Sequence, residues 1–334
     1  MRLAATRSRG DEYPLVSVII PCYQATDYVV QSIESAYAQT YPNVEVIVVD
    51  DGSTDGSYEL LLQLQQDRFP TLRVVTHENH VNLGVSTSRH RGLAVAKGEF
   101  IALLDADDEF EPDKIEKQVA VLLRSPDVVL CHTAVSVIGD RSNADEVEAQ
   151  FICNPSRPYY IRRIKGYLRR NGICASSVLV RTQVLRRVPC AMSQVFQVED
   201  WVCWVLLGRY GQFLLLEHKL VRYRVHAASA TALVQSNRLR RQYSVLEFKL
   251  ALVARSESTL HSVRCFLSAG VTIIKLLYLF IPGQASSPMG AGGQLNVVSR
   301  IAPRIAGRLL GAATAVGRPA GWISGGESRA NNEE

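Results

Sequence analysis

Short apolar runs alternate with amphipathic segments along the first part of the chain. Each run is bounded by polar residues, as buried strands are, and the runs lie at 15–20, 44–49, 72–76, 100–104 and 127–131. Helical spacing or helix-start signals mark the segments at 27–39, 53–66, 84–96 and 112–124. Strands that alternate with helices are joined by right-handed crossovers, so the pattern predicts an α/β fold with a mostly parallel sheet flanked by helices.

Polar residues follow three of the predicted strands at their carboxyl ends. These ends are Pro21-Cys22-Tyr23, Asp50-Asp51-Gly52-Ser53 and Asp105-Ala106-Asp107-Asp108. In an open α/β sheet, ligands bind at this edge. Clustered carboxylates repel one another unless a cation neutralises them, and Mg²⁺ or Mn²⁺ commonly bridges a carboxylate to a diphosphate. An isolated acidic pair is as often a solvated turn, but three coincident strand ends favour a metal-dependent nucleotide site.

Glycine-rich phosphate loops are absent from the sequence. The first strand-to-helix turn, 21–26, contains no glycine, whereas a dinucleotide site needs glycines there so that the backbone can approach a pyrophosphate. No Walker-type loop occurs elsewhere. A bound nucleotide diphosphate would therefore need a cation as its counter-charge.

Five segments follow one another in an order typical of one enzyme family. They are V-S-V-I-I-P-C-Y (16–23), V-D-D-G-S-T-D-G-S (49–57), E-N-H-V-N-L-G-V-S-T-S-R (78–89), D-A-D-D (105–108) and V-E-D-W (198–201). Together they resemble inverting glycosyltransferases of family 2, which have the Rossmann-like GT-A fold, over roughly residues 14–230. The resemblance implies transfer of a sugar from a nucleotide-diphosphate sugar, a UDP-sugar above all, to a hydroxyl of a glycan, a lipid-linked saccharide or another cell-surface precursor. The Q-x-x-R-W element of processive members is absent, which favours transfer of a single sugar.

The resemblance also assigns roles on the donor side of the site. It implies nucleotide contacts for Pro21, Tyr23, Asp51, Gly84, Arg89 and Asp105, and it implies that Asp107 holds Mg²⁺ or Mn²⁺. His226 is placed to approach the metal or the pyrophosphate, with a structural role as an equal alternative. Two positions depart from the family pattern, because Gln24 and His90 stand where asparagine is usual.

On the acceptor side, the resemblance implies that Asp200 is the general base, with Glu199 as the competing candidate. Ser176, Glu199 and Trp201 are expected along the acceptor cleft, Ser176 within a strand at 172–180. Trp201 fits a core position equally well. A basic segment at 151–170 is either a solvated face or a contact for an anionic acceptor. His77 and His80 have no further ligand nearby in the sequence and are interpreted as incidental.

The chain is expected to contain three parts. Residues 14–125 would bind the nucleotide sugar, residues 126–230 would bind the acceptor, and residues 231–334 would form a helical C-terminal region. The apolar run 265–281 is short for a spanning helix and contains Lys275, so it is expected to pack on the domain or to lie in the membrane interface.

Composition and net charge limit the classes of function that remain open. The net charge of +5 over 334 residues suits nucleotide diphosphates and anionic membrane surfaces, and no nucleic-acid-binding motif is present. Seven cysteines without a C-x-x-C pair, and no apolar signal segment, predict a cytoplasmic protein that can contact the inner face of the membrane. Two other classes stay open: a nucleotidyltransferase of similar fold and a non-catalytic nucleotide-sugar-binding protein.

Overall fold

The computed structural model describes residues 13–151, 159–162, 171–188, 199–227, 229 and 246. The chain divides into two compact units, 1–241 and 242–334. The predicted run at 265–281, and nearly all of the C-terminal region around it, lies outside the described residues, as does most of the basic segment 151–170. Within the described part of the chain, no helix has the length and apolar character needed to cross a membrane.

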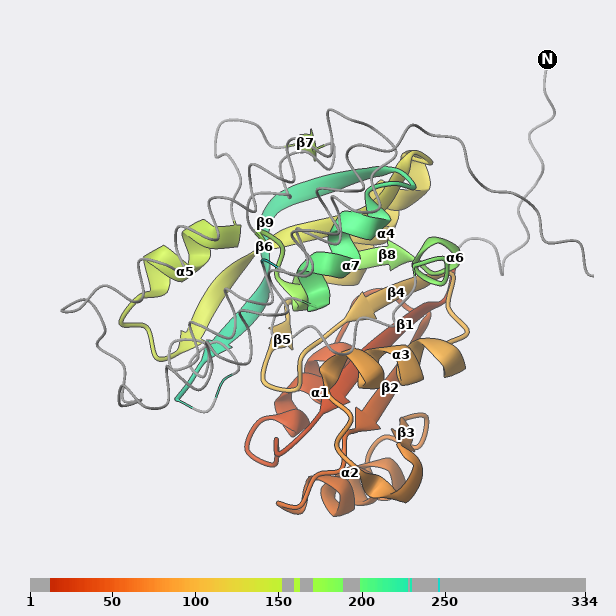
Figure 1. Ribbon diagram of the computed structural model, residues 1–334, viewed down its shortest axis with the longest axis vertical. Coiled ribbons are helices and arrows are strands. Elements are labelled where there is room, and N and C mark those ends of the chain that lie inside the picture. Colours follow the sequence, from red (N-terminus) through yellow and green to blue (C-terminus); the bar gives the residue numbers. More distant parts are fainter. Residues whose placement is uncertain are drawn as a thin grey trace, which may run out of the picture. The chain divides into compact units, whose positions relative to one another are not determined.

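A nine-stranded sheet forms the centre of the first unit (Figure 1). Its order is β3-β2-β1-β4-β8-β6-β9-β5, and β7 pairs with β9. The strands are β1 (Val16–Cys22), β2 (Val44–Asp50), β3 (Arg73–Thr76), β4 (Phe100–Leu103), β5 (Glu109–Phe110), β6 (Val128–Gly139), β7 (Tyr159–Arg162), β8 (Leu179–Arg181) and β9 (Gln212–Val225). The helices are α1 (Val29–Tyr37), α2 (Ser57–Asp67), α3 (Val85–Val95), α4 (Lys114–Arg124), α5 (Ala144–Phe151), α6 (Thr182–Leu185) and α7 (Glu199–Leu207).

The sheet is parallel on one side and mixed on the other. β1 pairs in parallel with β2 and β4, and β2 pairs in parallel with β3. β8 runs antiparallel to both β4 and β6, while β5 and β7 run antiparallel to β9. The α/β fold is confirmed, and the parallel pairs are those among β1 to β4 together with the long pair β6–β9. β5 and β8 are too short to leave a period in the sequence.

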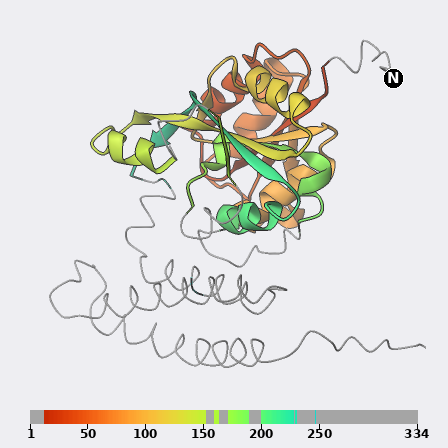
Figure 2. The same cartoon turned by 90° about the horizontal axis from the view of Figure 1, so that it is seen from above.

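Two apolar layers cover the two faces of the sheet. On one face, Val29 and Ile33 of α1 and Ile115 of α4 pack with alternate residues of β1. On the other face, Leu93 of α3 and Trp204 of α7 pack in a second core. Figure 2 shows α4 and α7 on opposite sides of the sheet. The carboxyl ends of β1, β2 and β4 are thereby left to carry the polar residues of the site.

One predicted strand is wrong over most of its length. Residues 172–180 were expected to be extended, but Ala175–Ser177 form a 3₁₀ turn (η3) before the short strand β8. The Ser177 hydroxyl donates to the Cys174 carbonyl over 2.7 Å, an example of a serine that competes with regular strand pairing. The turn buries Ser176 beside the acidic residues that follow β4.

Candidate active site

The acidic residues after β4 form a tight turn that α1 supports. The Asp108 backbone N–H donates to the Asp105 carbonyl over 3.0 Å. The hydroxyl of Ser32 on α1 lies within hydrogen-bonding distance of two carbonyls, those of Ala106 at 2.8 Å and Asp108 at 2.6 Å. These contacts fix the backbone of the turn, so its carboxylates project from a preformed frame.

Asp108 is the buried anchor of this turn. Its carboxylate accepts from the Ser176 hydroxyl at 2.5 Å and from the Arg224 backbone N–H at 2.9 Å. Burial and repulsion from Asp107 and Asp105 raise the pKa of Asp108 well above its ordinary value. Asp108 therefore ties the turn to η3 and β9, a role that the sequence did not separate from those of its acidic neighbours.

Asp107 and His226 come together from distant parts of the chain. His226 follows β9, and its Nε2 lies 3.1 Å from Asp107 Oδ2. Burial and repulsion from Asp105 raise the pKa of Asp107, and the hydrogen bond with His226 opposes that rise. The Tyr28 ring packs on His226 with 4.7 Å between ring centroids. His226 therefore lies beside the predicted metal ligand, and its own contact with a metal stays a prediction.

This pair offers two kinds of metal ligand. Asp107 has carboxylate oxygens, and Mg²⁺ is usually bound by one or two carboxylates together with substrate phosphates. His226 has an imidazole nitrogen, which is more usual as a ligand of transition metals. Among the described residues, no three histidine, cysteine or acidic side chains gather closely enough to hold a metal by themselves. A cation at Asp107 would need further ligands such as diphosphate oxygens.

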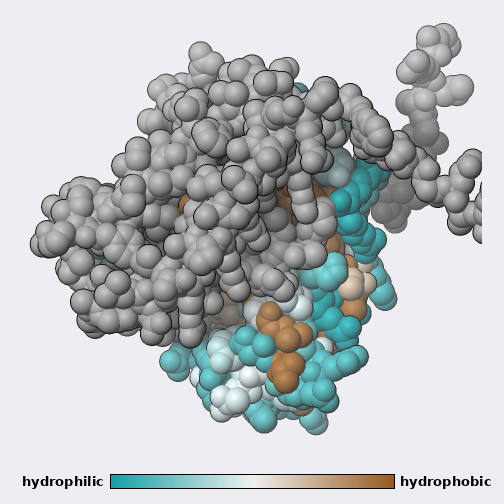
Figure 3. Space-filling view, viewed as in Figure 1, coloured by the Kyte–Doolittle hydropathy of each residue, from teal (hydrophilic) through white to brown (hydrophobic). Residues whose placement is uncertain are grey.

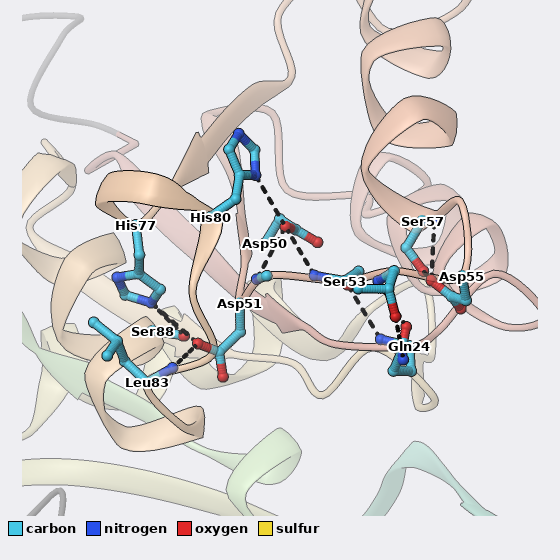
Figure 4. A network of polar contacts seen from close by, with 12 residues as sticks. Gln24, Asp50, Asp51, Ser53, Asp55, Ser57, His77, His80, Leu83 and Ser88 are labelled. Atoms are coloured by element: carbon cyan, nitrogen blue, oxygen red, sulfur yellow. Dashed lines mark hydrogen bonds and ion pairs between the residues drawn. The ribbon is translucent and has the colours of Figure 1, made fainter.

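Asp51 holds the loop between β3 and α3 (Figure 4). Its carboxylate accepts from the backbone N–H groups of Leu83 at 2.7 Å and Gly84 at 2.9 Å. His77 Nε2 lies 3.3 Å from Asp51 Oδ1 and 2.9 Å from the Ser88 hydroxyl. His77 is buried. Among the described residues His77 belongs to no metal-binding group, as the sequence indicated. It supports Asp51 instead, a contact that the sequence did not reveal because its other partner, Ser88, lies on α3.

Gly52 and Gly84 meet different demands of the same loop. Gly84 has a φ of +89° with open space around it, so glycine is needed there for the backbone conformation. At Gly52, φ is +73° and an added Cβ would lie 2.6 Å from the His80 carbonyl oxygen. The loop thus rests directly on the backbone of Gly52.

We expect Gly52→Ala to displace this loop and to lower nucleotide affinity about tenfold or more, since displacement costs at least about 1.4 kcal/mol of binding free energy. Gly56→Ala is the matched control. Gly56 has a similar φ of +91°, but an added Cβ would meet only the Thr26 methyl at 4.0 Å. Titration calorimetry with UDP measures affinity, and thermal unfolding measures the shared backbone strain. Equal affinity losses in both variants would show that the loop contact is irrelevant.

The chain at the end of β1 contacts the turn that follows β2. Pro21 is buried within β1, and Tyr23 is half exposed. Gln24 has a φ of +51° and pairs twice with Thr54: its Oε1 accepts from the Thr54 backbone, and its Nε2 donates to the Thr54 hydroxyl. The longer glutamine side chain therefore joins the β1 and β2 turns (Figure 4) at the position where asparagine is usual in the family.

Arg89 connects the acidic turn to the first residues of α7. Its Nη2 lies 2.6 Å from Asp105 Oδ1, and its Nη1 lies 4.0 Å from Glu199 Oε1. Burial alone would lower the pKa of Arg89, but Asp105, Glu199 and Asp200 raise it above its ordinary value. The guanidinium is therefore permanently charged and shared by carboxylates from two elements.

Glu199 and Asp200 differ in their hydrogen bonds. Asp200 accepts from Asn171 Nδ2 at 2.7 Å on one oxygen and from the Trp201 backbone N–H at 2.6 Å on the other. Burial raises the pKa of Asp200, while Arg89 and these hydrogen bonds oppose that rise. Burial and repulsion from Asp200 raise the pKa of Glu199 to about 7, although Arg89 opposes them. Asp200 therefore has two hydrogen bonds that favour its ionised form, and Asn171 is a supporting residue that sequence reasoning missed.

Two of the side chains predicted to meet the acceptor, Ser176 and Trp201, are buried. Ser176 is fully buried, and its hydroxyl donates to the Asp108 carboxylate and accepts from the Asp105 backbone N–H at 3.0 Å. Trp201 is 4% exposed and lies in the protein interior, as its alternative core role predicted. In the described structure both residues support the acidic groups, and an acceptor contact for either stays a prediction.

A small cavity of about 60 Å³ lies behind the Glu199–Asp200 pair. Its walls are mainly apolar side chains of α3, α6 and α7, and Arg89 and His90 also line it.

The outer surface of the described residues contrasts with this mainly apolar cavity. Figure 3 shows a described surface that is mainly hydrophilic with small apolar patches. The exposed apolar side chains near the site are Tyr23, Val81 and Leu83.

Comparisons with known proteins give relatives of this chain in sequence and in structure. The sequence model of the family described as Glycosyl transferase family 2 matches residues 17–188, about half of the chain. An uncharacterized glycosyltransferase of Haemophilus influenzae is 30% identical over 218 residues, which are 64% of this chain and 66% of the relative. The match thus spans slightly less than two thirds of that relative's length.

Solved structures show the same fold. S. aureus TarS 1-349 in complex with UDP has a TM-score of 0.59 at 16% identity, over 91% of this chain and 81% of TarS. The mannosyltransferase PcManGT from Pyrobaculum calidifontis, in complex with GDP-Man and Mn²⁺, has a TM-score of 0.54 at 16% identity, over 90% of this chain and 86% of its own. At these identities the likeness establishes the GT-A fold alone.

Proposed function

This chain belongs to glycosyltransferase family 2, and on that premise we propose that it moves one sugar from a nucleotide-diphosphate sugar to a hydroxyl acceptor with inversion at the anomeric carbon. The observation that carries the proposal is that Arg89 lies close to carboxylates of two different elements. Its guanidinium contacts Asp105 on the turn after β4 and lies 4.0 Å from Glu199 on α7, the neighbour of the proposed base Asp200, which supports a single site for donor and base.

Asp200 is the proposed base. It takes the proton of the acceptor hydroxyl while the acceptor oxygen forms a bond with the anomeric carbon. The bond between that carbon and the diphosphate oxygen breaks, and its electron pair leaves with the nucleoside diphosphate. Asn171 and the Trp201 backbone N–H hold the Asp200 carboxylate, and a positioned base of this kind contributes about 10²–10⁴-fold to the rate.

Donor binding is assigned to the residues at the ends of β1, β2 and β4. Tyr23 and the loop held by Asp51 would enclose the nucleobase, and Pro21 of β1 would close that pocket. Asp105 would approach the ribose. Asp107 and His226 would hold Mg²⁺ or Mn²⁺. A bound cation would supply Lewis-acid stabilisation of the departing diphosphate. A UDP-sugar is the proposed donor, and a saccharide or lipid-linked saccharide the proposed acceptor.

A screen of uridine and guanosine diphosphate sugars, with and without Mn²⁺, tests the proposal. We expect a UDP-sugar to raise the melting temperature only when Mn²⁺ is present, and we expect prolonged incubation to release UDP. Pyrophosphate released from a nucleoside triphosphate and a sugar phosphate would instead support a nucleotidyltransferase. Binding of a donor without any turnover, even with a wide range of hydroxyl acceptors, would support a non-catalytic binding protein.

A further inference from the structure

The positive charge of Arg89 lies between two groups of carboxylates. On the donor side its Nη2 is 2.6 Å from Asp105, and on the acceptor side its Nη1 is 4.0 Å from Glu199. The side chain is only 14% exposed, so water screens these interactions weakly. The Arg89 Nε is buried without a hydrogen-bond partner, which leaves the two Nη groups to make the described contacts of the guanidinium. A buried guanidinium that lies close to carboxylates on both sides of a site can change the ionisation of one side when its contact with the other side changes.

The other groups that face the Glu199–Asp200 pair do not provide this link. From α3, His90 lines the same cavity, and from α7, Cys203 does so. From the turn after β4, Asp105 repels both carboxylates and raises their pKa values, whereas Arg89 lowers them. Asn171 and the Trp201 N–H contribute neutral hydrogen bonds to Asp200. Arg89 and Asp105 therefore act on the base pair with opposite signs while contacting each other.

We propose that Arg89 is a positioning residue that couples the donor side of the site to the catalytic base. Asp105 holds the guanidinium toward the donor side, and the positive charge also favours the ionised form of the Glu199–Asp200 pair. When a bound donor engages Asp105, the guanidinium can move closer to Glu199, and it then favours the ionised form of the pair more strongly. The coupling rests on the proposed function, and it makes the ionised, proton-accepting form of the base most populated when a donor is present.

Two variants with opposite expected effects test the coupling. The readout is the acid limb of the pH profile of kcat for donor hydrolysis, in which water replaces the acceptor. Arg89→Gln removes the positive charge, so we expect the limb to move to higher pH by about one unit, the size expected for a charge within 4–6 Å. Asp105→Asn removes the repulsion and releases Arg89, so the limb is expected to move to lower pH. Arg89→Lys keeps the charge and should leave the limb near its wild-type position.

A purely structural role for Arg89 would lower kcat in Arg89→Gln without moving the limb. It would also give no displacement in Asp105→Asn, a nearly isosteric change that keeps the fold testable if Arg89→Gln fails to fold. Unchanged limbs, or limbs displaced in the same direction in both variants, would overturn the coupling. The proposed function fails separately: full hydrolysis in Asp200→Asn would remove the base itself, whatever the two limbs show.

Discussion

Replacing Asp200 by asparagine is expected to lower sugar transfer by about 10²-fold or more while nucleotide affinity stays near the wild-type value. The substitution keeps size and polarity but removes the basic oxygen. Asp200 accepts one hydrogen bond on each oxygen, from Asn171 and from the Trp201 N–H, and asparagine has a single oxygen. One of these bonds is therefore lost, at a cost of about 1 kcal/mol in the free energy of unfolding.

Glu199→Gln is the matched variant for this experiment. Glu199 neighbours Asp200 on α7 and lies 4.0 Å from Arg89, and its pKa of about 7 leaves it partly protonated at neutral pH. Its replacement is expected to change the pH profile more than the maximal rate. Kinetics at saturating donor measure sugar transfer, and calorimetry with UDP measures nucleotide affinity, in both variants. A hundredfold loss in Glu199→Gln together with normal transfer in Asp200→Asn would exchange the assignments.

Asp107→Ala is expected to remove the metal dependence of nucleotide binding. In the wild type, the raised pKa of Asp107 reflects burial and repulsion from Asp105, and a divalent cation relieves that repulsion while joining the turn to a diphosphate. We therefore expect Mn²⁺ to strengthen UDP binding in the wild type and to have little effect in the variant. The overall affinity of the variant should match that of wild-type protein in EDTA.

Asp67→Ala provides the control for this comparison, because Asp67 is an exposed carboxylate at the end of α2. Calorimetry of the two variants and the wild type, each with Mn²⁺ and with EDTA, completes the experiment. Should UDP bind the wild type equally well with Mn²⁺ and with EDTA, no metal would be needed for the nucleotide. Asp107 would then have only a local structural role beside His226.

The sequence was most informative where strand ends carry polar residues. Asp51, Asp105 and Asp107 were placed at one edge of the sheet because parallel strands bring their carboxyl ends together, and β1, β2 and β4 are parallel as expected. The pairing of His226 with Asp107 was left open, because it depends on where β9 ends in the sheet. Local pattern cannot specify that register.

Supporting residues were the main omission. His77 seemed isolated in the sequence, but its partner Ser88 lies on α3 and its neighbour Asp51 follows β2. Asn171 supports Asp200 from 29 residues away. The 3₁₀ turn at Ala175–Ser177 replaced a predicted strand because serine side chains satisfy the backbone locally. Such contacts form only in the tertiary structure, so neither periodicity nor motif order contains them.

The anomeric configuration of the released sugar tests the central claim most directly. Proton NMR during hydrolysis of an α-linked UDP-sugar with Mn²⁺ resolves the first product before mutarotation mixes the anomers. One carboxylate base acting on water with no covalent intermediate predicts that the β-anomer appears first, and that Asp200→Asn abolishes its appearance. Initial release of the α-anomer would contradict the inverting mechanism, because retention requires a different arrangement of the reacting groups from the single base at Asp200.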